Sequence, residues 1–174
     1  MKQIVVTACC IILCSIPALG QRKAAHGAAM TDQQFVNFAA QTDMVEANVG
    51  QLAQDAATKQ AIKDYGQMLV TDHTNDYHQL YTAAQQASLN VPNAIDPEHN
   101  KMMIDPFQKL KGAVFDRRFA REMVAGHTKA IDVYKKEASD AQNPALKSYA
   151  EQALPVLQKH LADAKDLEKG KTGK

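Results

Sequence analysis

Cysteine is almost absent from this sequence, and tryptophan is wholly absent. The three cysteines, Cys9, Cys10 and Cys14, all lie in the first 20 residues, which excludes disulfides, thiolate metal sites and a cysteine nucleophile from the rest of the chain. A glycine-rich phosphate loop and a serine at a nucleophile elbow are also missing. These absences argue against nucleotide-binding enzymes and the common hydrolases.

The positive and negative charges of the sequence are nearly balanced. The 174 residues contain 20 Lys and Arg against 19 Asp and Glu, and the first 20 residues contribute only Lys2, so the two signs balance in the remainder. Proteins that bind nucleic acids or anionic membranes through electrostatics carry a basic excess. We therefore expect no nucleic-acid partner. The few basic residues near the C-terminus are expected to form a flexible tail over residues 169–174.

The first 20 residues have the pattern of a secretory signal peptide. Lys2 precedes an apolar run from Ile4 to Ile16, and small residues stand three places and one place before Gln21. The run is shorter than the roughly 20 apolar residues that span a bilayer. A lipoprotein site, Val6 to Cys9, would leave too few residues in front of it for the apolar segment. We predict a cleaved signal peptide over residues 1–20 and no integral membrane segment after its removal. The predicted location is the periplasm, with outer-membrane attachment as the alternative.

Helical periodicity dominates the rest of the chain. Residues 21–31 are small and polar and are predicted to be a disordered lead-in, whereas apolar residues recur every three or four positions over residues 32–168, a single predicted domain. Capping residues divide this pattern into four helices. The first is capped by Thr31 or Asp32, the second is capped by Thr58 and spans about Lys59 to Ser88, the third follows Gly112 and ends near Ala141, and the fourth begins at Asn143–Pro144.

Two short joints and one long connection link these helices. The short joints near residues 58 and 142 make two antiparallel hairpins. Proline, asparagine and aspartate interrupt the pattern between Leu89 and Pro106, and a short helix is predicted from Pro106 to Leu110. Ala61–Gly66 matches Ala145–Ala150 at an offset of 84 residues, which indicates a duplicated hairpin. We predict an all-α fold, an antiparallel four-helix bundle of ferritin-like type with a long crossover between helices 2 and 3.

Several short segments resemble a known family when their order and spacing are taken together. They are Asp32 to Phe35, Glu46 with Leu52–Ala53, Met68 to Thr74, Gly112 with Phe115–Asp116, His127, and Leu154–Pro155 with His160–Leu161. In this order they resemble the bacterial DUF4142 family, which is placed among ferritin-like proteins and described mostly as exported or outer-membrane proteins. The resemblance implies a helical bundle and bacterial export. It implies no particular reaction.

Four ionisable residues lie on or beside the apolar faces, one on each predicted helix. They are Glu46, His73, His127 and His160. Burial of such groups is costly unless they are paired, hydrogen-bonded or metal-bound. At a rise of 1.5 Å per residue, the two residues of each hairpin differ by about 4.5 Å in height from their joint, so all four can meet in one layer.

The sequence leaves two interpretations of this layer open. Three imidazoles and one carboxylate suit zinc, copper or iron, with Asp72, Asp76 and Glu122 as further ligands or as carboxylates that orient the ligands. Alternatively, the histidines hydrogen-bond to Glu46, Asp43 or tyrosines, and the layer fixes the register of the helices.

Other candidate sites in the sequence are weaker. A di-iron oxidase needs Glu-x-x-His motifs on two helices, but Leu157 stands where the motif before His160 requires a glutamate. The tyrosines are expected to be ordinary bundle residues with hydroxyls in water, and His78 and His99 are expected to be exposed. The function predicted from the sequence is a non-enzymatic periplasmic binding or stress-associated module whose partner is unknown. The alternative is a metal-binding or redox protein that uses the polar layer, and a homo-oligomer stays open.

Overall fold

Four long helices make up most of the computed structural model, in which residues 30–170 are described. They are α1 (Asp32–Ala56), α2 (Gln60–Gln86), α5 (Gly112–Asp140) and α6 (Pro144–Glu168), and the described residues contain no strand. The connection from α2 to α5 contains the short helix α3 (Pro97–His99), a π-helical turn (η1, Asn100–Ile104) and α4 (Asp105–Gln108). The predicted signal peptide, the lead-in before residue 30 and residues 171–174 lie outside the described range.

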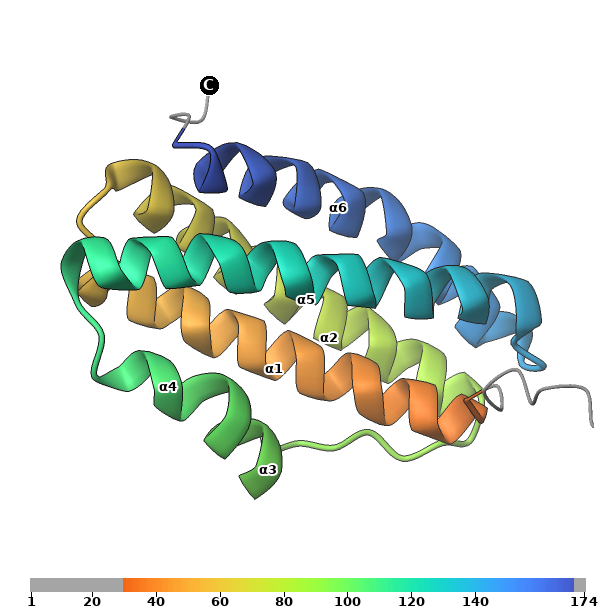
Figure 1. The fold of residues 1–174 in the computed structure, drawn as a ribbon. Coiled ribbons are helices and arrows are strands. Elements are labelled where there is room, and N and C mark those ends of the chain that lie inside the picture. Colours follow the sequence, from red (N-terminus) through yellow and green to blue (C-terminus); the bar gives the residue numbers. More distant parts are fainter. Residues whose placement is uncertain (1–29, 171–174) are drawn as a thin grey trace, which may run out of the picture.

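The long helices form two hairpins, α1–α2 and α5–α6, that pack against each other as a bundle (Figure 1). The connection between the hairpins runs back along α1, so α5 begins beside the joint of the first hairpin. At this joint the Asp116 carboxylate accepts hydrogen bonds from the backbone N–H groups of Thr58 and Lys59, at 3.0 and 3.2 Å. Each long helix therefore runs antiparallel to its two neighbours, which confirms the predicted bundle with a crossover between its second and third long helices.

The helix starts agree with the predicted caps at two positions and differ at a third. Thr31 caps α1 with a capping box, and the Asn143 side chain caps α6. The prediction that Thr58 caps the second helix is wrong, because α2 begins after Lys59, whose side chain makes no capping bond. The N–H groups at this joint are instead satisfied by Asp116, a long-range partner that local sequence does not indicate.

The crossover contains more helix than predicted. Asp96–Pro97 is predicted to interrupt helical structure, but Pro97 begins α3, and Asp96 Oδ1 accepts a hydrogen bond from the His99 N–H at 2.8 Å. The short helix predicted to start at Pro106 is α4, which begins one residue earlier. Proline is compatible with these positions because the first N–H groups of a helix have no partner within it.

Two apolar clusters fill the bundle on either side of its middle. One cluster includes Phe115 and Phe119 near the start of α5, and the other includes Phe35 and Tyr134 towards the opposite end. Along α2, α5 and α6, the histidines singled out in the sequence fall between these clusters, and on α1 Glu46 follows Val45 where the first cluster begins. The core therefore encloses a polar layer at mid-height. Within residues 30–170, no helix is both long and apolar enough to cross a membrane.

Three of the five tyrosines are buried with hydrogen-bonded hydroxyls, so the expectation that their hydroxyls lie in water is wrong. Tyr65 on α2 donates to the His160 carbonyl oxygen on α6 at 3.1 Å, and Tyr149 on α6 donates to Asp76 Oδ2 on α2 at 2.6 Å. The Tyr134 hydroxyl lies 3.0 Å from that of Tyr149. Tyr149 lies 84 residues after Tyr65, and Asp76 lies 84 residues before His160, so the same offset relates the two cross-helix contacts and supports a duplicated hairpin.

Helices α1 and α2 approach each other closely at a pair of glycines. A Cβ added to Gly50 would lie 2.6 Å from the Gly66 carbonyl oxygen, and one added to Gly66 would lie 2.7 Å from the Gly50 carbonyl oxygen and 2.9 Å from Ala53 Cβ. No side chain fits at either position without moving the backbone. This close approach fixes the spacing of the hairpin that carries Glu46 and His73.

Candidate metal centre

The ring orientation of His127 is set by a backbone carbonyl of its own helix. His127 is completely buried, and its Nδ1 lies 2.9 Å from the Met123 carbonyl oxygen. A carbonyl oxygen only accepts hydrogen bonds, so Nδ1 carries the proton and donates it. In the neutral ring, Nε2 is then an acceptor with a free lone pair. It is directed away from α5 into the polar layer, where Glu46 Oε2 lies 3.3 Å away.

His160 on α6 is oriented in the same manner by a carboxylate on α2. Its Nε2 lies 2.9 Å from Asp72 Oδ2, so this nitrogen donates to Asp72 and leaves Nδ1 as the acceptor of the neutral ring. Nδ1 lies 3.2 Å from His127 Nε2. Two acceptor nitrogens therefore face each other at a distance where a hydrogen bond requires a proton that neither neutral ring supplies.

His73 completes the set from α2. Its Nδ1 lies 2.9 Å from Asp43 Oδ1, and its Nε2 lies 3.4 Å from Glu46 Oε2. His73 is 2% exposed and Asp43 is 1% exposed. A buried carboxylate that holds one ring nitrogen fixes the plane of the imidazole and directs the other nitrogen into the layer.

The structure brings together all four residues proposed as ligands from the sequence. One nitrogen from each of the three histidines lies within 4.8 Å of the other two, and all three residues are buried. Glu46 Oε2 lies against two of these rings. Among the described residues, Glu46 Oε2 and His73 Nε2 are buried and have no hydrogen-bond partner. The ring nitrogens and this carboxylate oxygen therefore converge in one place inside the bundle.

The pKa shifts describe the charge of this cluster in the protein alone. Burial raises the pKa of Glu46, but the surrounding histidine rings lower it by a larger amount, so the resulting pKa is about 2. Burial lowers the pKa of His73, but the hydrogen bond with Asp43 and the nearby Glu46 carboxylate raise it to about 10. Burial lowers the pKa of His160 to about 4, although Asp72 opposes this shift. At neutral pH, His73 is therefore protonated beside an ionised Glu46, and His160 is neutral.

A chain of polar groups continues from the cluster towards the second apolar region. Burial raises the pKa of Asp43 to about 7, and burial also raises the pKa of the neighbouring Asp76. Asp76 accepts the hydrogen bond from Tyr149, whose pKa burial raises well above its usual value. The sequence named Asp43 only as a partner in a polar layer. Its position three residues before Glu46, on the same face of α1, is the signal that places it beside the proposed ligands.

The other candidate residues lie in different places. Asp72 adjoins the cluster and orients His160, whereas Asp76 lines a small cavity together with His73 and accepts a hydrogen bond from Tyr149. Glu122 is not brought to the cluster, since its carboxylate lies at the surface, 3.7 Å from Arg118 Nε. His78 is exposed, and His99 lies in the crossover with its Nδ1 2.8 Å from Asp96 Oδ2.

Comparisons with known proteins place this chain in a family. The sequence profile described as "Domain of unknown function (DUF4142)" matches residues 18–167. The chain belongs to the DUF4142 family. No match was found among curated protein sequences.

Solved structures with the same fold include metal-bound proteins. This DUF4142 chain is similar to the structure described as "CopM in the Cu(II)-bound form", with a TM-score of 0.68 and 18% sequence identity over 82% of this chain and 99% of that one. The Ag-bound form of CopM obtained by co-crystallization gives a TM-score of 0.65 and 18% identity, over 83% and 99% of the two chains. A DUF305 fragment from Deinococcus radiodurans gives 0.67 and 15%, over 82% and 99%. At these identities the similarity establishes the helical-bundle fold.

A narrow opening leads to the cluster from one side of the DUF4142 bundle. A cavity of about 10 Å³ between α2 and α6 is lined by Asp72, His73, Asp76 and His160, with Val156 among its apolar residues. This volume corresponds to about one water molecule. An ion that approaches from solvent along this side would meet Asp72, which is half-exposed, before the buried rings.

Proposed function

We propose that this chain is a metal-binding module that holds one transition-metal ion in the middle of its bundle. The proposed ligand atoms are His73 Nε2, His127 Nε2, His160 Nδ1 and Glu46 Oε2. The observation that supports this proposal is the tautomer pattern, in which each imidazole uses one nitrogen for an outer acceptor and directs the other into the shared centre. Metal-binding histidines in proteins are held in this manner.

The alternative is a buried polar layer that serves only to fix helix register. Such a layer is stable when its polar groups satisfy one another. Here Glu46 Oε2 and His73 Nε2 have no hydrogen-bond partner among the described residues, and two acceptor nitrogens face each other. A metal ion would use these lone pairs together, so the metal-binding interpretation leaves fewer polar atoms unsatisfied.

The proposed metal is Cu²⁺, with Zn²⁺ and Fe²⁺ as the alternatives. The converging atoms are three imidazole nitrogens and one carboxylate oxygen, a donor set that all three ions accept. Among them, a given nitrogen and oxygen site binds Cu²⁺ most tightly. CopM, which has this fold, is described in Cu(II)-, Cu(I)- and Ag-bound forms, and this adds support for copper. We further propose that the protein works in the periplasm and carries the ion without catalysing a reaction.

Elemental analysis of protein that has been expressed with its own leader and recovered from the periplasm tests this proposal. We expect about one equivalent of metal in the wild-type protein and loss of that metal in the His73→Ala/His127→Ala variant. A His78→Ala/His99→Ala variant is the matched control, because it removes two histidines outside the cluster and should retain the metal. Circular dichroism would show that each variant is folded. Wild-type protein that is folded, metal-free and unchanged by added Cu²⁺, Zn²⁺ or Fe²⁺ would contradict the proposal.

A further inference from the structure

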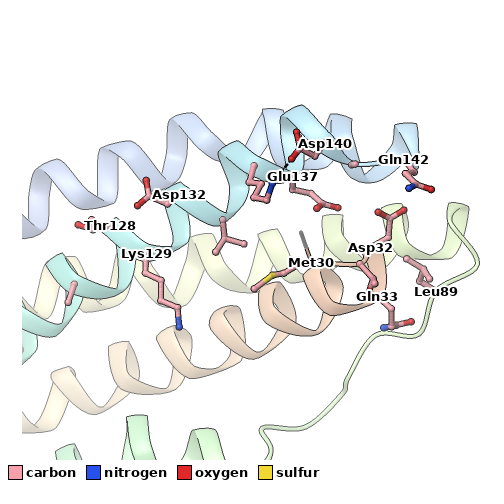
Figure 2. A pocket seen from close by; sticks show the side chains of 15 residues that line it. Met30, Asp32, Gln33, Leu89, Thr128, Lys129, Asp132, Glu137, Asp140 and Gln142 are labelled. Carbon is pink, nitrogen blue, oxygen red and sulfur yellow. Dashed lines mark hydrogen bonds and ion pairs between the residues drawn. The ribbon is translucent and has the colours of Figure 1, made fainter. Parts of the chain in front are cut away.

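A second cavity lies on another part of the molecule and shares no residue with the metal centre. It is a groove of about 1,100 Å³ between the start of α1 and the second half of α5 (Figure 2). Apolar side chains, including Met30, Leu89 and Val133, line part of it. Glu137 of α5 and Asp32 of α1 lie on its two sides (Figure 2). The groove therefore combines an apolar lining with carboxylates.

Glu137 is an unusual residue for such a groove because its carboxylate lacks a partner. The residue is 6% exposed, and its buried Oε1 has no hydrogen-bond partner among the described residues. Burial, followed by the charges of Asp32 and Asp140, raises its pKa to about 7. A buried carboxylate is costly unless a cation or donor is provided. A positively charged group that binds in the groove would therefore stabilise the Glu137 carboxylate.

The two lysines that line the groove make contacts elsewhere. Lys136 Nζ lies 2.5 Å from Asp140 Oδ2, and Lys129 Nζ lies 5.7 Å from the centre of the Phe38 ring. Neither forms an ion pair with Glu137 in the described part of the chain. A basic group from outside residues 30–170 can therefore supply the missing counter-charge of Glu137.

The chain itself supplies a segment of suitable composition at the mouth of the groove. Residues 21–29 contain Arg22 and Lys23, no acidic residue and several alanines, and they connect directly to Met30, a lining residue. Nine extended residues can span about 30 Å, so both cations can reach the carboxylates from this attachment point. Covalent connection also gives the segment a high effective concentration at the groove, which a free peptide lacks.

We propose that residues 21–29 occupy this groove, with the Arg22–Lys23 pair as the counter-charge of Glu137 and the alanines against the apolar lining. A second copy of the chain is the main competing occupant.

Paramagnetic labelling tests the proposal on the protein expressed with its own leader. A nitroxide is attached to an Ala25→Cys variant, and mass spectrometry verifies the mature N-terminus and a single label. We expect the Val133 methyl signals to be strongly broadened. In Glu137→Gln, which removes the charge but retains the shape, the docked population relative to the free one should fall about tenfold, since hydrogen bonds to charged groups are the stronger ones. Arg22→Ala/Lys23→Ala should have the same effect.

Controls separate docking from chance proximity and from self-association. Asp132→Asn removes an exposed groove carboxylate and should leave the broadening unchanged, and a label at Gly173→Cys should not affect Val133. Absence of broadening in the Ala25→Cys protein, or equal broadening in Glu137→Gln, would overturn the proposal. Broadening between labelled and unlabelled molecules in a mixed sample would also overturn it, because the occupant would then be a second copy.

Discussion

His127 Nε2 lies 3.2 Å from His160 Nδ1, and the outer partners of both rings make these two nitrogens acceptors. With both rings neutral, a proton or a metal ion between or beside the nitrogens is needed to satisfy the two lone pairs. Glu46 Oε2, at 3.3 Å from His127 Nε2, adds a negative charge to the same place. The bundle interior therefore favours positive charge at this place, and protons would compete with the proposed metal ion for the same atoms.

Competition with protons predicts that metal affinity rises with pH. The hydrogen bond with Asp43 and the nearby Glu46 carboxylate hold the pKa of His73 at about 10 against the effect of burial, so its ring is protonated at neutral pH. A metal ion that uses His73 Nε2 must displace this proton. We expect release of about one proton per bound Cu²⁺ and about tenfold tighter binding per pH unit between pH 7 and 9. Calorimetry at pH 7.5 in two buffers of different ionisation enthalpy measures the released proton, and a pH-independent affinity would contradict the assignment of His73 as a ligand.

The contribution of Glu46 to the free energy of unfolding is expected to depend on pH. Its folded pKa of about 2 is below the ordinary value of 4.5, so its contribution is complete above pH 4.5 and is lost as the pH falls towards 2. Glu46→Gln should therefore lower the free energy of unfolding of the metal-free protein by on the order of 3 kcal/mol at pH 7, and this difference should shrink below pH 4.5. Urea unfolding of both proteins at several pH values gives the comparison.

Glu122→Gln is the matched control for this experiment. Glu122 lies on α5 at the surface, near two arginines, and surface ion pairs contribute little to stability. Its substitution should change the free energy of unfolding by less than about 1 kcal/mol at pH 7. An equal loss in Glu46→Gln and Glu122→Gln would mean that the buried carboxylate is not stabilised by the histidine rings.

The sequence predicted the residues of the centre better than it predicted their partners. The helical repeat of 3.6 residues places Glu46 and the three histidines on the inward faces of their helices. Their distances along the helix axes, counted from the short joints, place them in one layer. Glu122 lies five residues before His127, and five residues turn a helix by about 140°, so its side chain points to the surface. The Met123 carbonyl that orients His127 gives no sequence signal, because every residue has one.

The spacing of the first hairpin also depends on residues that periodicity does not single out. Gly66→Ala replaces a hydrogen with a methyl group that would lie 2.7 Å from the Gly50 carbonyl oxygen. Alanine favours helices more than glycine does by about 1 kcal/mol, but overpacking of a close helix contact costs about 1–3 kcal/mol. We expect a net loss of stability and weaker metal binding, since α1 and α2 carry Glu46 and His73. Thermal unfolding of Gly66→Ala that equals or exceeds the wild type would show that the helices separate without cost.

The cavity between α2 and α6 predicts the route by which the ion reaches its ligands. Val156 is 43% exposed and lines this cavity together with His73 and His160, but it offers no ligand atom. Val156→Phe should cover the opening with a larger side chain and slow the uptake of Cu²⁺ several-fold, while the equilibrium affinity stays within about threefold because the ligands are unchanged.

Stopped-flow mixing of metal-free protein with Cu²⁺ measures this uptake rate, and a competition titration measures the affinity. Val114→Phe enlarges a valine of similar exposure at the start of α5, away from the cavity, and should leave both quantities unchanged. Uptake that is equally fast in Val156→Phe and wild type would place the route elsewhere.

The alternative route lies between α1 and α5, where Glu46 Oε1 lies 3.2 Å from the position of a Cβ added to Gly126. Gly126→Ala is therefore the variant to measure next. Slower uptake in Val156→Phe but not in Gly126→Ala would assign the route to the side of the bundle that Asp72 borders. The half-exposed Asp72 carboxylate can attract the cation there and bring it towards His160.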